Sequence, residues 1–237
     1  MLRQVITPAK AVLNHAARRG WCEPPRFERV RGGSRRTDWI LPAEAEAMLT
    51  AASEHFRPLL TFLLCTGARV GEAVNLEWAD VNLRLASVNL RETKNGDDRR
   101  LDLPPRAIEA LRALHAALGG PDVARVGPVF LTDKRRPYRA TNDAKGGATG
   151  GQIRRAFAGC LRKAGIERVL VPHICRHTWA TWHYALHHDL VRLREDGGWR
   201  TTVMCERYTK LAPAGLVPEV LALLGLKPAT ARRRRSA

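Results

Sequence analysis

Val171-Pro-His-Ile-Cys-Arg-His-Thr-Trp-Ala180 is the stretch around which the chain is organised, together with Gly197-Gly-Trp-Arg-Thr-Thr-Val-Met-Cys-Glu-Arg-Tyr-Thr-Lys210 shortly after it. A helix is predicted to start near His173, so His173 and Arg176 project from the same side of its first turns. A second helix is expected to carry Tyr208 soon after the Gly-Gly-Trp turn. A histidine, a tyrosine and an arginine, joined by a second arginine from upstream, can hold a phosphodiester and attack it.

The composition favours a polyanionic partner. The chain has 237 residues with a formal net charge of +17, and its sequence pI is about 10.9. Such a charge favours nucleic acid first and a membrane surface second, although a basic protein without such a partner stays open. The 45% of hydrophobic residues are enough for a core. Because no apolar run reaches about 18 residues, no membrane span is expected, and the N-terminus lacks the apolar core of a signal peptide.

The cysteines and histidines do not predict a metal site. The five cysteines are scattered and form no C-x-x-C pair, which is typical of small buried side chains in a reducing cytoplasm. Two histidine pairs four residues apart, His173/His177 and His183/His187, could chelate zinc. Neither pair has a third ligand or a glutamate base in an H-E-x-x-H setting. We therefore expect no metal and no cofactor.

The first 34 residues read as a helix followed by a linker. Pro8 suits a helix start and Gly20 its stop, and Pro24-Pro25 and the basic segment 31–36 follow. One helix cannot bury its own apolar stripe, so this piece must dock on something. It resembles the end of a domain whose earlier part is missing.

Arg69 is predicted to lie at a junction between two helices. An apolar helix from Arg57 to Leu64 ends at Thr66-Gly67, and helical spacing resumes at Val70 and continues to Trp78. Free backbone N–H groups and a guanidinium would lie close together there, which favours an anion. From this segment alone, an exposed surface arginine is an equally good interpretation.

Lys94 is predicted to lie at the tip of a β-hairpin. Apolar and polar residues alternate on both sides of Lys94-Asn-Gly-Asp, and Asn-Gly between such runs is a strong hairpin signal. A lysine on a turn is usually solvated, but here it could reach into a groove and donate a proton. Further on, the pattern predicts helices at Pro105–Leu118, Ile153–Ala164 and Val217–Leu226 and a short strand at Val129–Leu131. The Gly-rich segment before Ile153 lacks the ending of a P-loop, so nucleotide binding is not expected.

These motifs together resemble the catalytic domain of the tyrosine recombinases, the phage integrase family. The first box is Thr66-Gly-Ala-Arg-Val-Gly-Glu-Ala-Val-Asn-Leu-Glu-Trp-Ala-Asp-Val81, and Thr93-Lys94-Asn-Gly matches the family's hairpin lysine. His173-Ile-Cys-Arg176-His-Thr matches the H-x-x-R box, and Tyr208 stands at the position of the nucleophile. Gly197-Gly-Trp199 stands where the family usually has Gly-His, and an indole N–H can also donate to a phosphate oxygen.

The resemblance runs from roughly Trp39 to Leu211 and implies the fold and the domains. The implied fold is mainly α-helical with a small antiparallel β-sheet. Residues 1–34 would be the last helix of a truncated core-binding domain plus a linker, residues 35–215 the catalytic domain, and residues 216–237 a C-terminal helix and a basic tail. In the family, the segment after the nucleophile often docks on an adjacent protomer, while docking on its own chain is at least as good an expectation before DNA is bound.

The resemblance also implies the catalytic residues, which are Arg69, Lys94, His173, Arg176, Trp199 and Tyr208, with Glu72 in support. The two arginines would clamp the non-bridging oxygens of a phosphate. Tyr208 would attack the phosphorus, while Lys94 protonates the leaving 5′ oxygen. His173 would assist proton transfer at the tyrosine, Trp199 would donate to the phosphate, and Glu72 would orient the site.

The function implied is site-specific recombination of DNA through a 3′-phosphotyrosine link, without metal or ATP. The implied partners are double-stranded DNA and further copies of the chain, as a tetramer on the DNA, and the implied location is the nucleoid in the cytoplasm. Two alternatives stay open: relaxation of DNA as by a type IB topoisomerase, and a DNA-binding remnant that has lost catalysis. Covalent trapping of DNA would separate the active proteins from the inactive one.

Overall fold

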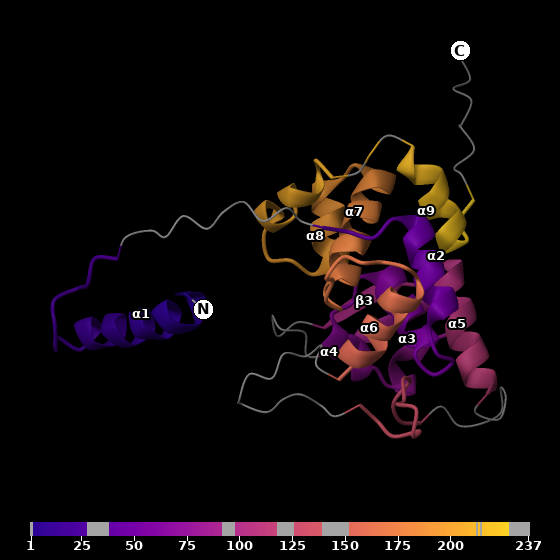
Figure 1. The fold of residues 1–237 in the computed structure, drawn as a ribbon, viewed down its shortest axis with the longest axis horizontal. Helices are drawn as coiled ribbons and strands as arrows, with labels where there is room; N and C mark the ends of the chain where they lie inside the picture. The colour runs from indigo at the N-terminus through magenta and orange to yellow at the C-terminus, as the bar shows by residue number, and fades with distance from the viewer. Residues whose placement is uncertain are drawn as a thin grey trace, which may run out of the picture. The chain divides into compact units, whose positions relative to one another are not determined.

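The structure is a computed structural model that describes residues 2–27, 38–91, 98–117, 126–138, 152–211, 213 and 215–227. The chain divides into two compact units, residues 1–36 and 37–237, which are described separately below. In Figure 1 the first unit is indigo, and the second carries the remaining colours of the chain.

The first unit contains the helix α1 (Leu2–Arg18). This helix begins earlier than the sequence predicts. Pro8, the predicted start, lies inside it. The side chain of Lys10, within the helix, lies 4.7 Å from the ring centre of Phe27, which follows the helix. Val5 and Val12 are each about two-thirds exposed. The helix thus leaves apolar side chains uncovered within its own unit, as a lone amphipathic helix must.

The second unit is mainly helical with a small antiparallel sheet, which confirms the predicted fold class. Its described elements, with η for a 3₁₀ helix, are α2 (Pro42–Ala51), α3 (Arg57–Thr66), α4 (Val70–Val74), η1 (Trp78–Asp80), β1 (Val81–Asn82), β2 (Ser87–Leu90), β3 (Arg99–Asp102), α5 (Pro105–Ala116), α6 (Arg154–Lys163), α7 (Ile174–His187), α8 (Leu190–Gly197), η2 (Thr202–Met204), η3 (Glu206–Tyr208) and α9 (Leu216–Leu224).

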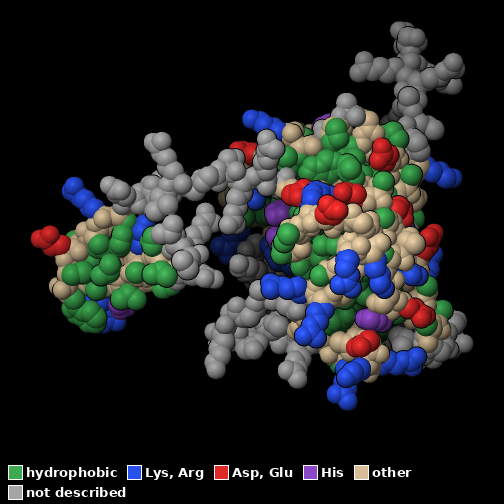
Figure 2. Space-filling view, viewed as in Figure 1, with side chains coloured by type: hydrophobic (Ala, Val, Ile, Leu, Met, Phe, Trp, Pro, Cys, Tyr) green, Lys and Arg blue, Asp and Glu red, His purple; other side chains and the backbone are tan. Residues whose placement is uncertain are grey.

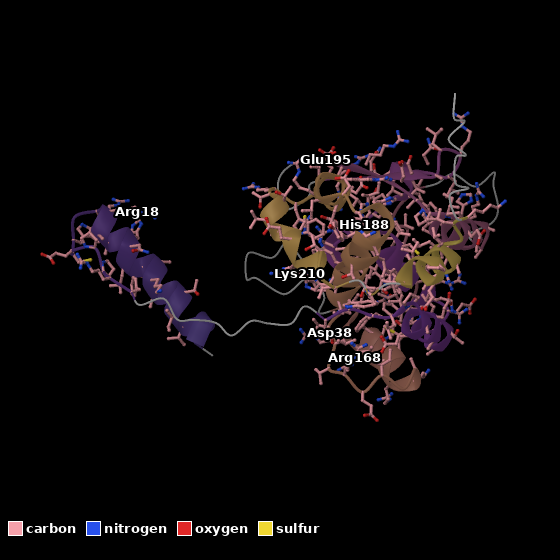
Figure 3. All side chains as sticks on the ribbon, turned by 90° about the horizontal axis from the view of Figure 1, so that it is seen from above. Arg18, Asp38, Arg168, His188, Glu195 and Lys210 are labelled. Atoms are coloured by element: carbon pink, nitrogen blue, oxygen red, sulfur yellow. The ribbon has the colours of Figure 1, made fainter. Side chains whose placement is uncertain are left out.

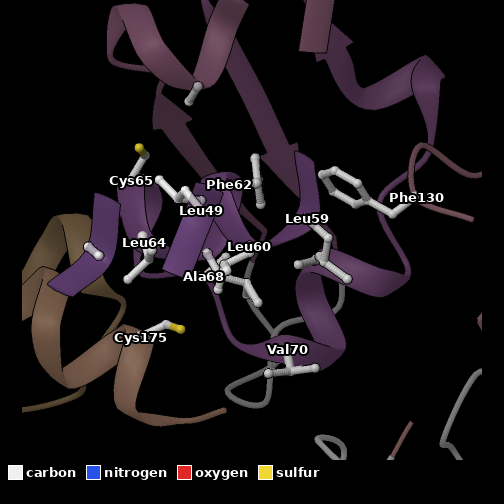
Figure 4. Packing of buried hydrophobic residues seen from close by; sticks show 14 of the residues in the cluster. Leu49, Leu59, Leu60, Phe62, Leu64, Cys65, Ala68, Val70, Phe130 and Cys175 are labelled. Carbon is white, nitrogen blue, oxygen red and sulfur yellow. The ribbon is translucent and has the colours of Figure 1, made fainter. Parts of the chain in front are cut away.

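Helix α3 lies at the centre of this unit. Every residue from Leu59 to Thr66 is buried, as expected for a helix that is apolar on all sides. It contacts α2, α4, α5 and α7. Figure 4 shows its side chains Leu59, Leu60, Phe62 and Leu64 within the core, and the Phe62 ring centre lies 5.4 Å from that of Phe130. Because α3 is packed on all sides, its C-terminal end gives Arg69, three residues further on, a fixed starting point.

The sheet has the strand order β1-β2-β3, and both pairings are antiparallel. Val88 pairs with Leu101 and Leu90 with Arg99, which confirms the predicted hairpin strands. The hairpin tip with Lys94 lies outside the described residues. The strand predicted at Val129–Leu131 is wrong. This segment forms the isolated bridges Glu77↔Pro128 and Leu131↔Pro137 instead, so it has no continuous partner strand.

Helix α9 packs on its own chain. It contacts α2, α5 and α7, and Val220 and Leu223 are buried in the same core as α3. Of the two expectations for this segment, docking on its own chain is the one seen here. The five cysteines are free, and all except Cys22 are buried. None of the described helices is long and apolar enough to cross a membrane.

Surface ion pairs fasten the beginning of the second unit to the segment before α7. Arg168 contacts the carboxylates of Asp38 and Glu44, each at 2.6 Å, and Asp38 and Arg168 lie side by side in Figure 3. Exposed pairs of this kind contribute little individually. In the interior, the Ile40 N–H donates to the Thr178 hydroxyl at 2.9 Å and anchors the segment before α2 to α7. Figure 2 shows Lys and Arg gathered on the lower part of this face, with Asp and Glu among them.

Candidate active site

Arg69 is placed by the end of α3 and the start of α4. Gly67 ends α3 with a left-handed backbone (φ 63°), and its N–H donates to Leu63 O at 3.0 Å. A side chain at Gly67 would place Cβ 2.3 Å from the ring of Trp179, so only glycine allows α3 to approach α7 here. Arg69 follows in an extended conformation as the N-cap of α4. The sequence therefore predicts this junction correctly, although α4 ends at Val74 and not at Trp78.

Glu72 holds Arg69 from both ends. One carboxylate oxygen accepts from the Arg69 backbone N–H at 2.8 Å, and the other contacts the guanidinium. The Glu72 side chain is only 6% exposed. Burial alone would raise the pKa of Glu72, but Arg99 and Arg69 outweigh it and hold the pKa below its ordinary value. Glu72 is thus an anion that contacts two arginines, Arg69 and Arg99, and its predicted role in orienting the site stays a prediction.

Arg176 comes from the first turn of α7, which begins at Ile174 with His173 as its N-cap, as predicted. The residue is 3% exposed. Its guanidinium donates to Gly67 O at 2.7 Å and also to Gly197 O, so it joins the end of α3 to the end of α8. Burial, together with Arg69 and Arg99, lowers the pKa of Arg176 to about 9. The group is still a cation at neutral pH.

Arg99 is a third, partly buried arginine beside Glu72, and it is not among the residues predicted from the sequence. Its side chain is 10% exposed and donates to Glu72 at 3.1 Å and to Asp196 O at 3.1 Å. A signal was present, because residues two apart on a strand share a face and Leu101 faces the core. An arginine in phase with that apolar residue points inward, where it needs a charged partner.

Three consecutive carbonyls at the end of α8 hold these three arginines. Asp196 O accepts from Arg99, Gly197 O from Arg176, and Gly198 O from Arg69 at 3.3 Å. Carbonyls at a helix C-terminus lack partners within the helix and lie at the negative end of its dipole. The end of α8 therefore fixes what we call the arginine cluster (Arg69, Arg99 and Arg176).

Tyr208 lies in η3 and not in the regular helix that the sequence predicts. It is 2% exposed, and its hydroxyl lies 2.8 Å from Nδ1 of His177. Burial raises the pKa of Tyr208, while Arg207 and Arg176 partly oppose the rise. The phenol is therefore neutral at physiological pH and needs an acceptor for its proton before it can attack.

His177 contacts the tyrosine, although the sequence did not single it out for this contact. The resemblance to the family implies that His173 handles the tyrosine's proton, but the tyrosine hydroxyl contacts the histidine one turn later. His173 is exposed, and its ring lies 4.9 Å from that of His177. Burial, His173, Arg207 and Arg176 lower the pKa of His177 to about 4, so its imidazole is neutral at pH 7. The signal was available, because residues four apart on a helix share a face.

Trp199 lies between the arginine cluster and the tyrosine. Its ring centre is 4.1 Å from the Arg176 guanidinium carbon and 5.7 Å from the Tyr208 ring centre. It also stacks on Trp179, with ring centres 6.3 Å apart. The structure thus brings together Arg69, Arg176, Trp199 and Tyr208 with Glu72 in support. Donation from the Trp199 indole to a phosphate stays a prediction, and Lys94 lies outside the described residues.

The other histidine pair of α7 serves a different contact. His183 Nε2 lies 2.8 Å from the Asp196 carboxylate, and the His183 and His187 ring centres are 4.6 Å apart. Among the residues that the structure describes, no group of three or more His, Cys, Asp and Glu is arranged to hold a metal ion. The pair instead fastens α7 to the end of α8, next to the carbonyls that hold the arginines.

Comparisons with known proteins identify the family. The profile of the phage integrase family matches residues 38–214, which is most of the chain, and the protein therefore belongs to this family. Relatives include the integrase of Salmonella phage P22, which is 27% identical over 216 residues covering 86% of this chain and 52% of the relative. The tyrosine recombinase XerC of Bifidobacterium longum (strain DJO10A) is 31% identical over 182 residues covering 72% of this chain and 48% of the relative. The chain spans about half the length of the curated relatives that it matches.

Solved structures support the fold. The XerA recombinase matches with a TM-score of 0.63 and 24% identity, over 90% of this chain and 72% of that one. A lambda integrase dimer bound to a COC′ core site matches with a TM-score of 0.66 and 16% identity, over 86% and 71%. At these identities the likeness establishes a shared fold.

Proposed function

We propose that the protein is a site-specific DNA recombinase, or integrase, that cleaves and rejoins DNA strands through a 3′-phosphotyrosine intermediate. The observation that carries this proposal is the position of Tyr208, whose ring lies 5.7 Å from Trp199, while Trp199 lies 4.1 Å from the Arg176 guanidinium. A nucleophile and a phosphate-binding cation therefore share one site. The family to which the chain belongs supports the same chemistry.

The arginine cluster would receive the scissile phosphate. A guanidinium has five N–H donors, and Arg176 uses two of its nitrogens on Gly67 O and Gly197 O. The remaining N–H groups of Arg176 and Arg69 would bind the non-bridging oxygens and stabilise the charge that builds up on the phosphorane. Because Glu72 and the end of α8 already fix both arginines, little reorganisation is needed when the phosphate arrives.

The bond changes are those of a transesterification. The Tyr208 oxygen forms a bond to phosphorus and loses its proton, while the bond from phosphorus to the 5′ oxygen breaks. Lys94 donates a proton to that leaving oxygen, Trp199 donates to the phosphate, and His173 assists at the tyrosine. Attack by a 5′ hydroxyl reverses the step and frees Tyr208. The ester energy is kept in the phosphotyrosine, so the scheme has no place for ATP.

The proposed partners are double-stranded DNA and three further copies of the chain on it. The net charge of +17 supports a DNA partner, and the lambda integrase structure is of a dimer bound to a core site. Residues 1–34 would be the last part of a core-binding domain plus a linker, residues 35–215 the catalytic domain, and residues 216–237 the C-terminal helix and basic tail. The place of action would be the nucleoid.

Covalent trapping tests this proposal directly. Nicked duplexes with a randomised centre lose the cleaved 5′ fragment after attack, so the covalent complex accumulates. After denaturation, wild-type protein should remain covalently attached to duplexes that share one recurring sequence, and Tyr208→Phe supplies the background. The selected duplex should then support strand exchange between two labelled copies. Plasmid relaxation without dependence on that sequence would instead indicate a type IB topoisomerase, and no covalent DNA would indicate an inactive remnant.

DNA binding is expected to depend strongly on salt. A protein that neutralises roughly 6–10 phosphates loses on the order of 10³–10⁵ in affinity between 50 and 200 mM salt, because bound counterions are released. Phosphate contacts of this kind carry no sequence information, so binding should also be weakly selective. Filter binding or anisotropy across this salt range measures the slope. A flat plot would contradict the electrostatic part of the proposal.

A further inference from the structure

We propose that His177 is the proton acceptor for Tyr208 in the cleavage step, a role that rests on the proposed function and that the motif comparison assigns to another histidine. The Nδ1 atom of His177 lies 2.8 Å from the Tyr208 hydroxyl. This distance is within the range required of a general base, about 2.6–3.2 Å. The ring of His173 instead contacts the ring of His177, with ring centres 4.9 Å apart.

The surroundings keep His177 in the form that accepts a proton. It is half-buried between its own helix, which contributes His173 and Arg176, and η3, which contributes Arg207 and Tyr208. Burial and the nearby cationic groups lower its pKa to about 4, so the ring is neutral. A bound phosphate would offset the charges of Arg176 and Arg207, but burial, the largest cause of the lowered pKa, would remain. The ring of His177 therefore stays neutral and able to accept the proton.

The step balances without another reactant. As the Tyr208 oxygen attacks phosphorus, its proton passes to Nδ1 of His177, and the bond from phosphorus to the 5′ oxygen breaks. When a 5′ hydroxyl later attacks the phosphotyrosine, the imidazolium returns the proton to the leaving tyrosine oxygen. His177 therefore acts as base in cleavage and as acid in rejoining, as microscopic reversibility requires.

The first test is the tautomer of His177, which can be measured without DNA. Two-bond ¹H–¹⁵N spectra of ¹⁵N-histidine protein should show Nδ1 without a proton and Nε2 with one, and the Nδ1 shift should change in Tyr208→Phe. A proton on Nδ1 would overturn the proposal, since His177 would then donate to the phenol. Because this measurement does not require activity, a protein that failed to cleave DNA would still give an answer about the hydrogen bond.

The second test is the pH dependence of single-turnover cleavage on the selected duplex. Wild type should be flat between pH 7 and 9, because its base is already neutral. His177→Gln keeps a side chain of similar reach but accepts no proton, so its rate should rise about tenfold per pH unit with the fraction of ionised tyrosine. His188→Gln, at the opposite end of α7, is the control and should stay flat. A flat profile in His177→Gln, or cleavage faster than wild type at pH 7, would show that the contact only sequesters the tyrosine.

A second, independent observation concerns the Gly-Gly-Trp turn, and we infer that Gly197 is a positioning residue for Trp199. A Cβ built on Gly197 would lie 1.9 Å from the Trp199 ring, a distance that no packing tolerates. Gly197 is not among the positive-φ glycines, whereas Gly198 has φ 64°. The backbone at Gly197 therefore accepts any residue, and only the indole requires glycine there. The ring occupies the space of the missing side chain, and from there it covers Arg176 and approaches Tyr208.

A double-mutant cycle tests this coupling. Gly197→Ala should lower the Tm by about 4 °C or more, since overpacking must displace the ring. It should also slow covalent trapping at least about tenfold. In a Trp199→His background the smaller ring leaves room for the alanine side chain. Gly197→Ala should therefore change the Tm and the trapping rate less there than in wild type. Rescue of the trapping rate in that background distinguishes positioning of the ring from general damage.

Gly159→Ala on α6 is the matched control. A Cβ at Gly159 meets nothing within 4 Å, so alanine should leave trapping unchanged and raise the Tm slightly. Equal effects of Gly197→Ala in the two backgrounds would overturn the inference. The Tm part of the cycle does not depend on DNA cleavage, so its failure can be told apart from failure of the proposed function.

Discussion

The arginine cluster and the tyrosine segment, residues 200–211, meet in one site but are held in different ways. Each arginine of the cluster donates to a carbonyl at the end of α8, and Glu72 binds two of them. The tyrosine segment consists of two 3₁₀ turns, and the side-chain bond between Tyr208 and His177 links it to α7. Val203 and Met204 in this segment are more than half exposed. The arginine cluster is therefore fixed by backbone carbonyls and a carboxylate, whereas the tyrosine segment is held by one side-chain bond and by the burial of Tyr208 and Cys205.

The largest effect is expected from Tyr208→Phe, which removes only the nucleophilic oxygen. Covalent attachment to DNA should be abolished, while DNA affinity should stay nearly unchanged because the cluster is untouched. A denaturing gel of the trapping reaction measures the first quantity, and anisotropy measures the second. A covalent complex with the variant would exclude Tyr208 from its role. A large loss of affinity would show that the two regions are less independent than their contacts indicate.

Arg176→Lys should have the next largest effect, because an ammonium cannot replace a planar guanidinium that bridges two carbonyls. Loss of one preorganised donor costs about 10²–10³ in rate. We also expect the free energy of unfolding to fall by about 1–3 kcal/mol, since Gly67 O or Gly197 O loses its partner. Arg155→Lys, on the exposed face of α6, is the control and should change neither quantity. Single-turnover trapping and denaturant titration provide the measurements.

Glu72→Gln tests the arginine cluster through pH. The pKa of Glu72 is lower in the folded protein than in the unfolded chain, so its charge stabilises the fold above about pH 4.3 and stops doing so as the pH falls through the folded value. At pH 7 the variant should lose about 3 kcal/mol of unfolding free energy, because the partly buried Arg69 and Arg99 lose their carboxylate. The difference from wild type should shrink as the pH falls through the lowered pKa of folded Glu72, where wild type also becomes protonated. A difference that stayed constant from pH 7 to pH 3 would contradict the assignment.

The residues predicted from sequence are those whose role is encoded locally. The Gly67 stop places Arg69, the turn before α7 places Arg176, and the alternating pattern gives β2 and β3. Each depends on a few neighbouring residues, so spacing was sufficient.

Arg99 and His177 were missed because their partners come from other parts of the chain. Arg99 lies 97 residues from Asp196, and His177 lies 31 residues from Tyr208. The tyrosine segment is also 3₁₀ rather than α-helical. Its Thr201-Thr202-Val203 run is β-branched, which disfavours a regular helix. The sequence therefore predicted the list of chemical groups better than the contacts among them.

The smallest effect is expected at α9, which lies outside both regions but packs against α7, the helix that carries Arg176 and His177. Val220 is fully buried in the main core, whereas Val217 on the same helix is only partly buried. Val220→Ala should therefore lower the free energy of unfolding by about 1.5–2.5 kcal/mol, from two lost carbon groups plus a small cavity. Val217→Ala is the matched control and should cost less.

This comparison also decides where α9 belongs. If α9 packs on its own chain, Val220→Ala destabilises the protein in the absence of DNA and at any concentration, as denaturant titration would measure. If α9 instead docks on a neighbour, the unfolding free energy of the free protein should not change, and the variant should reduce the size of complexes formed on the selected duplex. An unchanged unfolding free energy with smaller complexes would thus place α9 in assembly and would leave the arginine cluster and the tyrosine segment to act without its support.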